Sequence, residues 1–326
     1  MSAIVEKGAG IGSARANLDV FSSTVQKLAE NDKDVLVVTS DSRGSGKLTP
    51  FGQKFPKQII EIGIAEQNLV GVAAGLASTG KKVFAVSPAC FLTARALEQI
   101  KNDVAYSDNP VKLIGISAGV SYGALGTTHH SLHDYAVLRA INNMMVVAPA
   151  DNFETEEAII KASAMNHPVY LRFGKKPMPD LQTTNKHSFE FGKGRIIRNG
   201  QDIAFIATGE TVFPALQAAM QLESEHGIQS TVISMHTIKP LDYELVNAIA
   251  TRCNALVTVE EHMIYGGLGE ACAAHLLKAG FNKPFEIVGI PDEYTVTGSQ
   301  IEILAHYGIS EKGLTETALK LLKKSA

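Results

Sequence analysis

The stretch EIGIAEQNLVGVAAGLASTGKKVFAVS, residues 61–87, joins a helix of small residues to a buried strand. Its first part predicts a helix over 66–79 that begins with Glu66, an acid in the first turn, where the helix dipole favours negative charge. The run KVFAVS (82–87) has the length and composition of a buried strand. Small residues allow a helix to pack closely, so the stretch predicts one helix–strand unit of an α/β sheet.

Strand and helix patterns alternate in the same way along the preceding and following chain. Strands are expected at 35–40, 82–87, 112–118, 144–150 and 169–173, and helices at about 14–30, 66–79, 91–106, 132–141 and 152–166. Asp151 or Asn152 can serve as the N-cap of the last helix. Such alternation predicts a mostly parallel sheet that is covered by helices on both faces.

A second region of the same kind follows a break in the pattern. The segment GKKPMPDLQTTNKHS, which begins at Gly174, has two prolines and few apolar residues, as a linker does. Strands then recur at 202–208, 230–235, 255–261 and 285–290, with helices near 210–225, 241–252 and 267–280. The sequence therefore predicts an α/β fold of two domains: a parallel-sheet domain over 1–178, a linker over 179–200 and a smaller α/β domain over 201–326.

The composition narrows the class of protein. Hydrophobic residues make up 45% of the 326 residues and charged residues 19%, which is normal for a globular protein. A net charge of −3 without long runs of like charge gives no basis for binding nucleic acid or a membrane surface. No apolar run is long enough to span a membrane, and three separated cysteines do not indicate a disulfide framework. We expect a cytoplasmic protein.

The stretch GTTHHSLHD, residues 126–134, places three histidines and an aspartate within nine residues. It could be a metal site, a catalytic loop or a polar helix start. On a helix His129 and His133 would share a face, as paired zinc ligands do. No cysteine or distant histidine is evidently recruited to the stretch, which favours the other two interpretations and predicts no metal site in this chain.

Several motifs together resemble those of the transketolases, in the family's order and over nearly the whole chain. They are GIAEQN (63–68), RALEQIKNDVAY (95–106), GALGTTHH (123–130), AVLRAINNMMVVAPAD (136–151), TIKPLD (237–242) and VEEHMIYGGLGEA (259–271). The resemblance covers the two C-terminal domains of a full-length transketolase. It implies a pyrimidine-binding domain followed by the transketolase C-terminal domain.

The resemblance also implies a cofactor and a partner. Transketolases use thiamine diphosphate with Mg²⁺, and their N-terminal domain holds the diphosphate and the metal through a GDG motif and a later Asn. No GDG occurs in the 326 residues. The implied arrangement is the C-terminal subunit of a split transketolase that acts on sugar phosphates. An N-terminal transketolase subunit with the GDG motif would join it in an α2β2 assembly.

Two residues match the family's catalytic positions. Glu66 matches the glutamate that faces N1′ of the aminopyrimidine, and its alternative is an ordinary first-turn acid. His129 matches the histidine that hydrogen-bonds the oxygens of the transferred fragment, and its alternative is a polar turn residue. The resemblance transfers no role to His130 or His133, which are expected at the rim or on a helix surface, although His130 could reach substrate.

Further residues match the family's binding positions. Arg15, Ser45 and Arg172 fall at or near positions that grip the substrate's terminal phosphate, a task that suits the arginine fork. Asp41 resembles the family's polar residue near the cofactor. The alternative for each is a surface residue.

Two departures from the family pattern affect the expected specificity. Leu125 in GALG stands where transketolases commonly have an Asp that touches a sugar hydroxyl, which favours a branched ketose phosphate, such as an apulose phosphate, over the usual linear sugars. SPACFL stands where the family has aromatic residues around the pyrimidine. An ungapped alignment puts Ala89 and Leu92 there, whereas a shift lets Phe91 stack on the ring.

Some alternatives stay open on the sequence alone. GGLGEA (266–271) could be an anion site at a helix N-terminus, although a tight structural turn fits it better, and His262 is expected to be structural or interfacial. The chain could instead be the β subunit of a 2-oxoacid dehydrogenase or a fragment similar to deoxyxylulose phosphate synthase. It could also be a noncatalytic partner subunit.

Overall fold

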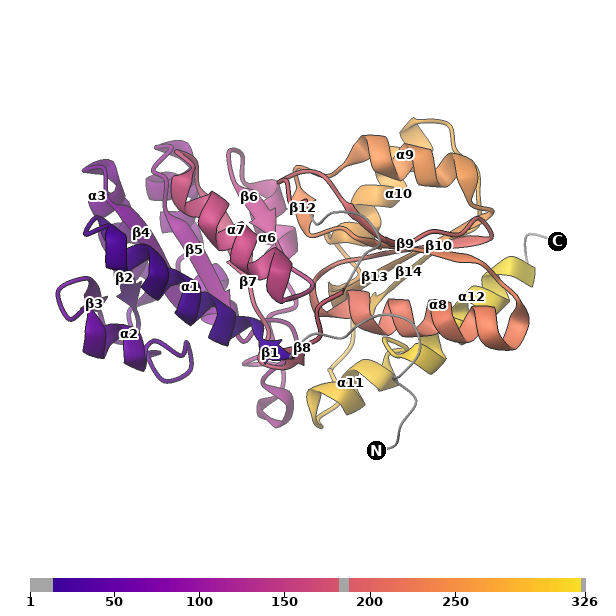
Figure 1. Cartoon of the computed structure of the whole chain (residues 1–326), viewed down its shortest axis with the longest axis horizontal. Helices are drawn as coiled ribbons and strands as arrows, with labels where there is room; N and C mark the ends of the chain where they lie inside the picture. The colour runs from indigo at the N-terminus through magenta and orange to yellow at the C-terminus, as the bar shows by residue number, and fades with distance from the viewer. Residues whose placement is uncertain (1–13, 182–187, 324–326) are drawn as a thin grey trace.

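Two sheets lie side by side, each with helices on both faces (Figure 1). The structure is a computed structural model and describes residues 14–181 and 188–323. The start of the predicted first domain and residues 182–187 of the predicted linker lie outside the described residues. The α/β fold with two domains is confirmed.

The first sheet has seven strands in the order β12-β6-β7-β5-β4-β2-β3, all parallel except β12. Its strands are β2 (Val35–Thr39), β3 (Ile59–Glu61), β4 (Lys82–Pro88), β5 (Lys112–Ile116), β6 (Met145–Val147), β7 (Val169–Arg172) and β12 (Thr237–Lys239). The five strands expected from the sequence are present. The short strands β3 and β12 were not expected, because two or three residues carry no periodic signal.

Alternating side chains of the buried strands point to opposite faces of this sheet. Val35 and Val37 pack with α1, α2 and α7, whereas Val38 packs with the helices of the other face. The helices are α1 (Asn17–Asn31), α2 (Thr49–Lys54), α3 (Glu66–Ser78), α4 (Ala89–Arg95), α5 (Leu97–Gln99), a π-helical segment (Ile100–Tyr106), α6 (Asp134–Ala140) and α7 (Asn152–Ala164). Asp151 caps α7 by accepting a hydrogen bond from the backbone N–H of Glu154, as predicted.

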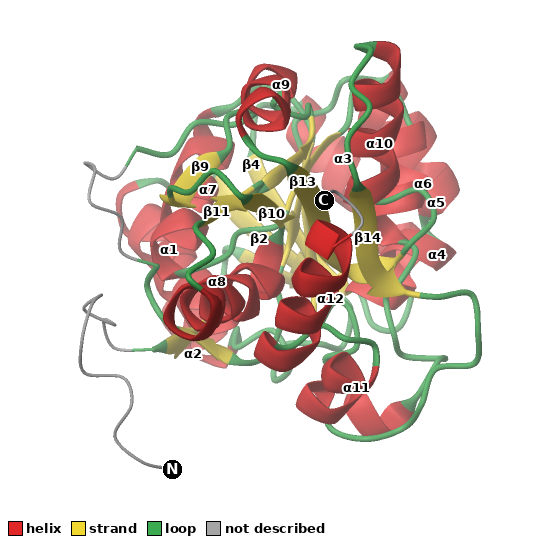
Figure 2. Cartoon of the chain, turned by 90° about the vertical axis from the view of Figure 1, so that its right-hand side faces the viewer, coloured by secondary structure: helices red, strands yellow, loops and turns green. Residues whose placement is uncertain are grey.

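The second sheet has five strands in the order β14-β13-β10-β11-β9, of which only β9 is antiparallel. Figure 2 shows α9 and α10 on one side of it and α8 and α12 on the other. The strands are β9 (Arg195–Arg198), β10 (Ile203–Ala207), β11 (Ser230–Ser234), β13 (Ala255–Met263) and β14 (Phe285–Ile290). The helices are α8 (Val212–His226), α9 (Tyr243–Arg252), α10 (Leu268–Lys278), α11 (Gln300–His306) and α12 (Glu311–Lys323).

Two features cross the predicted domain boundaries. Strand β9 lies within the predicted linker 179–200 but belongs to the second sheet. Strand β12, from the TIKPLD motif of the predicted second domain, pairs with β6 and extends the first sheet. A small two-stranded sheet of β1 (Arg15–Ala16) and β8 (Pro177–Met178) ties the two ends of the first domain together.

The two domains also share buried apolar side chains. Val120, Leu132 and Ala150 of the first domain are buried in the same cluster as Val259 and Ile290 of the second. The loop after β5 is therefore fixed between the domains. No helix within the described ranges is long and apolar enough to cross a membrane.

Candidate active site

The candidate site lies beyond the carboxyl ends of four neighbouring strands of the first sheet, β5-β4-β2-β3. Asp41 follows β2, Glu66 follows β3, Phe91 follows β4 and His129 follows β5. Ligands of parallel α/β sheets gather at this edge, because the connecting loops leave a crevice there.

Glu66 is the first residue of α3, and its side chain is only 5% exposed. Its two carboxylate oxygens each accept a hydrogen bond from Nη1 of Arg95, at 3.1 Å. The rest of α3 packs through Leu69, Ala73 and other small residues against the sheet. This close packing holds the carboxylate at the protein surface of the crevice, where one cation covers it.

Phe91 and Arg95 lie one turn apart on α4, on the face that meets Glu66. The guanidinium carbon of Arg95 is 4.2 Å from the centre of the Phe91 ring, within the range of a cation–π contact. Leu92 is fully buried in the core beneath the same helix. Successive residues of a helix point about 100° apart, so the expectation that Leu92 contacts the cofactor is corrected, and Phe91 is the side chain presented to the site.

His129 extends this row of side chains to the loop after β5. Its ring lies edge-on to both Phe91 and Tyr122, with each pair of ring centres 5.4 Å apart. The Nζ of Lys175 lies 3.8 Å from the centre of the Tyr122 ring. A continuous row of contacts therefore runs Glu66–Arg95–Phe91–His129–Tyr122–Lys175; we call it the site row.

The three histidines of GTTHHSLHD point to separate partners. His130 is buried, and its Nε2 and Nδ1 lie 3.0 and 3.2 Å from the carbonyl oxygen of Gly123 and the hydroxyl of Thr295. Burial lowers the pKa of His130. His133 lies 3.2 Å from the Thr93 hydroxyl. Helix α6 starts only at Asp134, so His129 and His133 do not share a helical face.

This divergence matters for the predicted metal chemistry. Within residues 14–181 and 188–323, no group of three or more His, Cys, Asp or Glu side chains is placed to hold a metal ion. Of the three histidines, the structure brings only His129 into the site row.

The predicted phosphate-binding residues lie apart from one another. Arg172 is buried and donates from Nε to Asp134 Oδ2 at 2.8 Å, so the expectation that it grips a phosphate is corrected. Arg15 is exposed, and its Nη2 donates to the hydroxyl of Ser23 and a backbone carbonyl of α1. Ser45 is exposed in the loop after β2.

Two other predicted residues lie at the edges of the site. Asp41 is exposed, has a φ of +48° and donates from its backbone N–H to Glu61 Oε1. Leu125, in a short 3₁₀ turn, is 56% exposed. Both are open to contact with a partner or a ligand.

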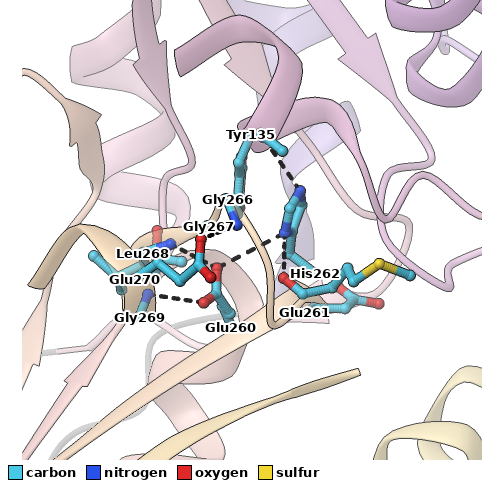
Figure 3. Close-up of polar contacts among 12 residues, drawn as sticks. Tyr135, Glu260, Glu261, His262, Gly266, Gly267, Leu268, Gly269 and Glu270 are labelled. Carbon is cyan, nitrogen blue, oxygen red and sulfur yellow. Dashed lines mark hydrogen bonds and ion pairs between the residues drawn. The ribbon is translucent and has the colours of Figure 1, made fainter. Parts of the chain in front are cut away.

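The GGLGEA turn is occupied by a carboxylate of the chain itself (Figure 3). Glu260 accepts hydrogen bonds from the backbone N–H groups of Leu268 and Gly269 at 2.7 and 2.8 Å. A Cβ on Gly267 would lie 1.9 Å from Glu260 Oε2, so only glycine fits there. The turn is therefore a structural cap of α10.

His262 is likewise a packing residue. It is fully buried, and its ring stacks on that of Tyr135 with centres 4.8 Å apart. Burial lowers its pKa to about 4, so the ring is neutral near pH 7. Since Tyr135 belongs to α6 and His262 to β13, the stack joins the two domains.

A pair of carboxyl groups also lies at the domain junction. Nε2 of Gln300 donates to Glu210 Oε2 at 3.1 Å and to Glu261 Oε1 at 2.8 Å. Burial and the neighbouring Glu261 raise the pKa of Glu210 to about 8. Within the described part of the chain, Glu210 Oε1 is buried without a hydrogen-bond partner.

The sequence analysis missed three members of the site row. Arg95 could have been found from its position four residues after Phe91 on a helix. Tyr122 lay within the quoted loop after β5 but had no distinguishing pattern. Lys175 was placed at the start of the predicted break between the domains, where a lysine is usually part of the solvated surface.

The fold and the site row together define the class of protein. Residues 14–179 match the family "Transketolase, pyrimidine binding domain", and residues 192–314 match "Transketolase, C-terminal domain". The chain belongs to the transketolase family, as the motifs predicted.

Individual relatives narrow the comparison. The chain is 46% identical to one of the subunits of apulose-4-phosphate transketolase, that from Phocaeicola vulgatus, over 304 residues, which cover 93% of this chain and 96% of that protein. It is also 37% identical to 1-deoxy-D-xylulose-5-phosphate synthase from Acidovorax sp. (strain JS42), covering 90% of this chain but only 46% of that one.

A solved structure agrees with the first of these relatives. A structure described as a split gene transketolase, inactive beta4 tetramer, superposes with a TM-score of 0.84 at 33% identity, covering 97% of this chain and 100% of that chain. This chain thus has the extent of the separate subunits to which it is similar.

Proposed function

We propose that this chain is the C-terminal, catalytic subunit of a two-chain transketolase, which transfers a two-carbon ketol unit between sugar phosphates. The observation that carries the proposal is the site row, in which the buried carboxylate of Glu66 and the ring of His129 are joined through Phe91 and Arg95. The match to a separate transketolase subunit over nearly its whole length supports it.

The residues of the site fit the aminopyrimidine of thiamine diphosphate. A flat group with N–H donors already lies over Phe91 and against Glu66, namely the guanidinium of Arg95. An aminopyrimidine is also flat and presents a ring nitrogen and an amino group. Once bound, thiamine diphosphate supplies the electron sink that allows a carbon–carbon bond beside a carbonyl to break.

Each residue of the chain then has a separate task. Glu66, in its low-dielectric position, holds a proton at N1′ of the ring. Phe91 stacks on the ring, and His129 hydrogen-bonds the hydroxyl and carbonyl oxygens of the transferred fragment. The diphosphate and Mg²⁺ are assigned to the partner chain, because no metal-binding group lies within the described ranges of this one.

The assembly follows from the same division of tasks. Ile64, two residues before Glu66, is 74% exposed, and Leu125 on the other side of the site row is 56% exposed. A partner chain that covers this edge would bury both side chains and complete the site. We propose an α2β2 assembly with an N-terminal subunit that carries GDG, located in the cytoplasm.

The substrate is proposed to be a ketose phosphate that lacks the usual hydroxyl contact. Lys175, which ends the site row, is the cation placed to meet a phosphate, since Arg172 is held by Asp134. Arg15, Ser45 and Asp41 keep their predicted roles as proposals. Leu125 offers an apolar surface where an acid would bind a hydroxyl, which supports a branched sugar such as apulose 4-phosphate.

The test is to co-express the chain with an N-terminal subunit that carries GDG, and to measure ketol transfer with thiamine diphosphate and Mg²⁺. Glu66→Gln is expected to assemble normally and to lose a factor of about 10²–10⁴ in kcat. Glu98→Gln, at an exposed position of α5, is the matched control and should keep full activity. Near-normal turnover by Glu66→Gln would refute the catalytic role of that residue.

A second function is supported by the similarity to deoxyxylulose phosphate synthase. A synthase of that kind, or a 2-oxoacid dehydrogenase subunit, would release CO₂ from a 2-oxoacid. The same purified pair is therefore assayed for CO₂ release. Release of CO₂ without ketol transfer would favour this alternative, and inactivity in both assays would favour a noncatalytic partner subunit.

A further inference from the structure

Arg95 contacts both groups that would hold the aminopyrimidine. Its Nη1 donates to each carboxylate oxygen of Glu66, and its guanidinium carbon lies 4.2 Å from the centre of the Phe91 ring. A ring that stacks on Phe91 and bonds to Glu66 would need the same space and the same acceptor. Arg95 and the cofactor ring therefore exclude each other in this position.

The chemistry of the guanidinium explains why it can take that place. It is flat, it stacks on aromatic faces, and it presents N–H donors in a fixed plane. It also neutralises Glu66, whose side chain is 5% exposed and whose charge would otherwise be buried without a partner. The unassembled chain thus has a reason to keep Arg95 on Glu66.

The contact is also built to open. The Arg95 side chain is 48% exposed, so it can rotate toward solvent while α4 stays in place. Leu92, which is fully buried in the core, fixes that helix from its other side. An ion pair with one exposed partner contributes little net free energy, because solvent screens it. A bound cofactor can displace it.

We propose that Arg95 is a placeholder that occupies the aminopyrimidine position in the unliganded chain and must leave Glu66 before the cofactor ring binds. This inference rests on the proposed function, because it assumes that the ring binds between Phe91 and Glu66. Its consequence is that removal of the guanidinium increases affinity for the cofactor. A residue with a merely structural role would, when removed, leave the affinity unchanged or lower it.

The experiment measures binding rather than turnover. Isothermal calorimetry of the assembled two-chain protein, titrated with thiamine diphosphate in Mg²⁺, compares wild type with Arg95→Met. We expect Kd to fall about threefold to tenfold, the range that corresponds to loss of a partly exposed ion pair. Lys101→Met removes the same charge from an exposed position in the adjoining π-helical segment, and should leave Kd unchanged.

A second variant and a second ligand keep the test decisive. Arg95→Gln, which lacks the charge and the stacking plane, should also tighten binding if Arg95→Met assembles poorly. Thiamine, which lacks the diphosphate, should show the same gain. Equal or weaker binding by both Arg95 variants, with wild type binding normally, would overturn the placeholder alone. Absence of binding by wild type and variants would overturn the placeholder and the proposed function together.

Discussion

Arg172 and Asp134 form an ion pair in which Nε and Oδ2 are 2.8 Å apart and both side chains are almost fully buried. Nη2 of Arg172 also donates to the carbonyl oxygen of Glu261 at 2.8 Å, which links β7 of the first domain to β13 of the second. Burial alone would raise the pKa of Asp134, but Arg172 and Tyr170 hold it below its ordinary value. The pair is thus part of the domain junction.

Arg172→Ala is expected to lower the free energy of unfolding by about 3–5 kcal/mol, because it leaves the Asp134 charge buried without a partner. Urea unfolding of the purified chain measures the loss. Lys27→Ala, which breaks an exposed pair with Glu156, is the control and should change stability by less than about 1 kcal/mol. A loss below about 1 kcal/mol for Arg172→Ala would contradict the structural role.

Glu210→Gln is expected to make the chain more stable than wild type as the pH rises. Burial raises the pKa of Glu210 from 4.5 to about 8. The folded chain therefore keeps a proton that the unfolded chain releases, so the stability is fully present below about pH 4.5 and falls as the pH approaches 8. Glutamine removes this loss.

Melting temperatures of both proteins between pH 5 and pH 8.5 provide the measurement for Glu210. The gain of Glu210→Gln over wild type should be about 1–3 kcal/mol greater at pH 8.5 than at pH 5, since one pKa unit corresponds to about 1.4 kcal/mol. Glu225→Gln, at an exposed position of α8, should follow wild type at every pH. Parallel curves for wild type and Glu210→Gln would refute the assigned shift.

Lys175→Met is expected to raise KM for a phosphorylated ketose by about tenfold, because it removes the charge that ends the site row. KM for the same sugar without phosphate should stay within about twofold. Steady-state kinetics of the assembled pair on both sugars measure the two values. An equal effect on both sugars would show that Lys175 does not meet the phosphate. Lys312→Met, in α12, is the control.

Leu125→Asp is expected to shift preference toward linear ketose phosphates, because an acid there can accept a hydrogen bond from a sugar hydroxyl. The ratio of kcat/KM for linear over branched donors should rise about tenfold or more. Leu125 is 56% exposed, so the substitution should not disturb the core. An unchanged ratio would remove the argument for a branched substrate.

Local patterns in the sequence were sufficient for most of the fold. The apolar runs of β2 and β4 alternate between the two faces of the sheet, and that period is written in consecutive residues. Asp151 as the cap of α7 and Glu66 as the first residue of α3 were predicted because capping depends on residues within one turn. Such features need no knowledge of distant segments.

The surroundings of charged side chains could not be predicted in this way. Whether Arg172 faces a substrate or Asp134 depends on how β7, α6 and β13 pack, and those elements are far apart in the chain. The same is true of β12, whose three residues extend the first sheet although their neighbours along the chain belong to the second.

The sequence by itself determined the two-domain α/β fold, the transketolase family and the positions of Glu66 and His129 at the edge of the first sheet. Only the tertiary structure decided that Phe91 rather than Leu92 faces the site, that Arg172 is structural, and that Arg95 lies on Glu66. The reason is physical: periodicity fixes which face of an element is buried, whereas the partner of a charge depends on which distant element packs beside it.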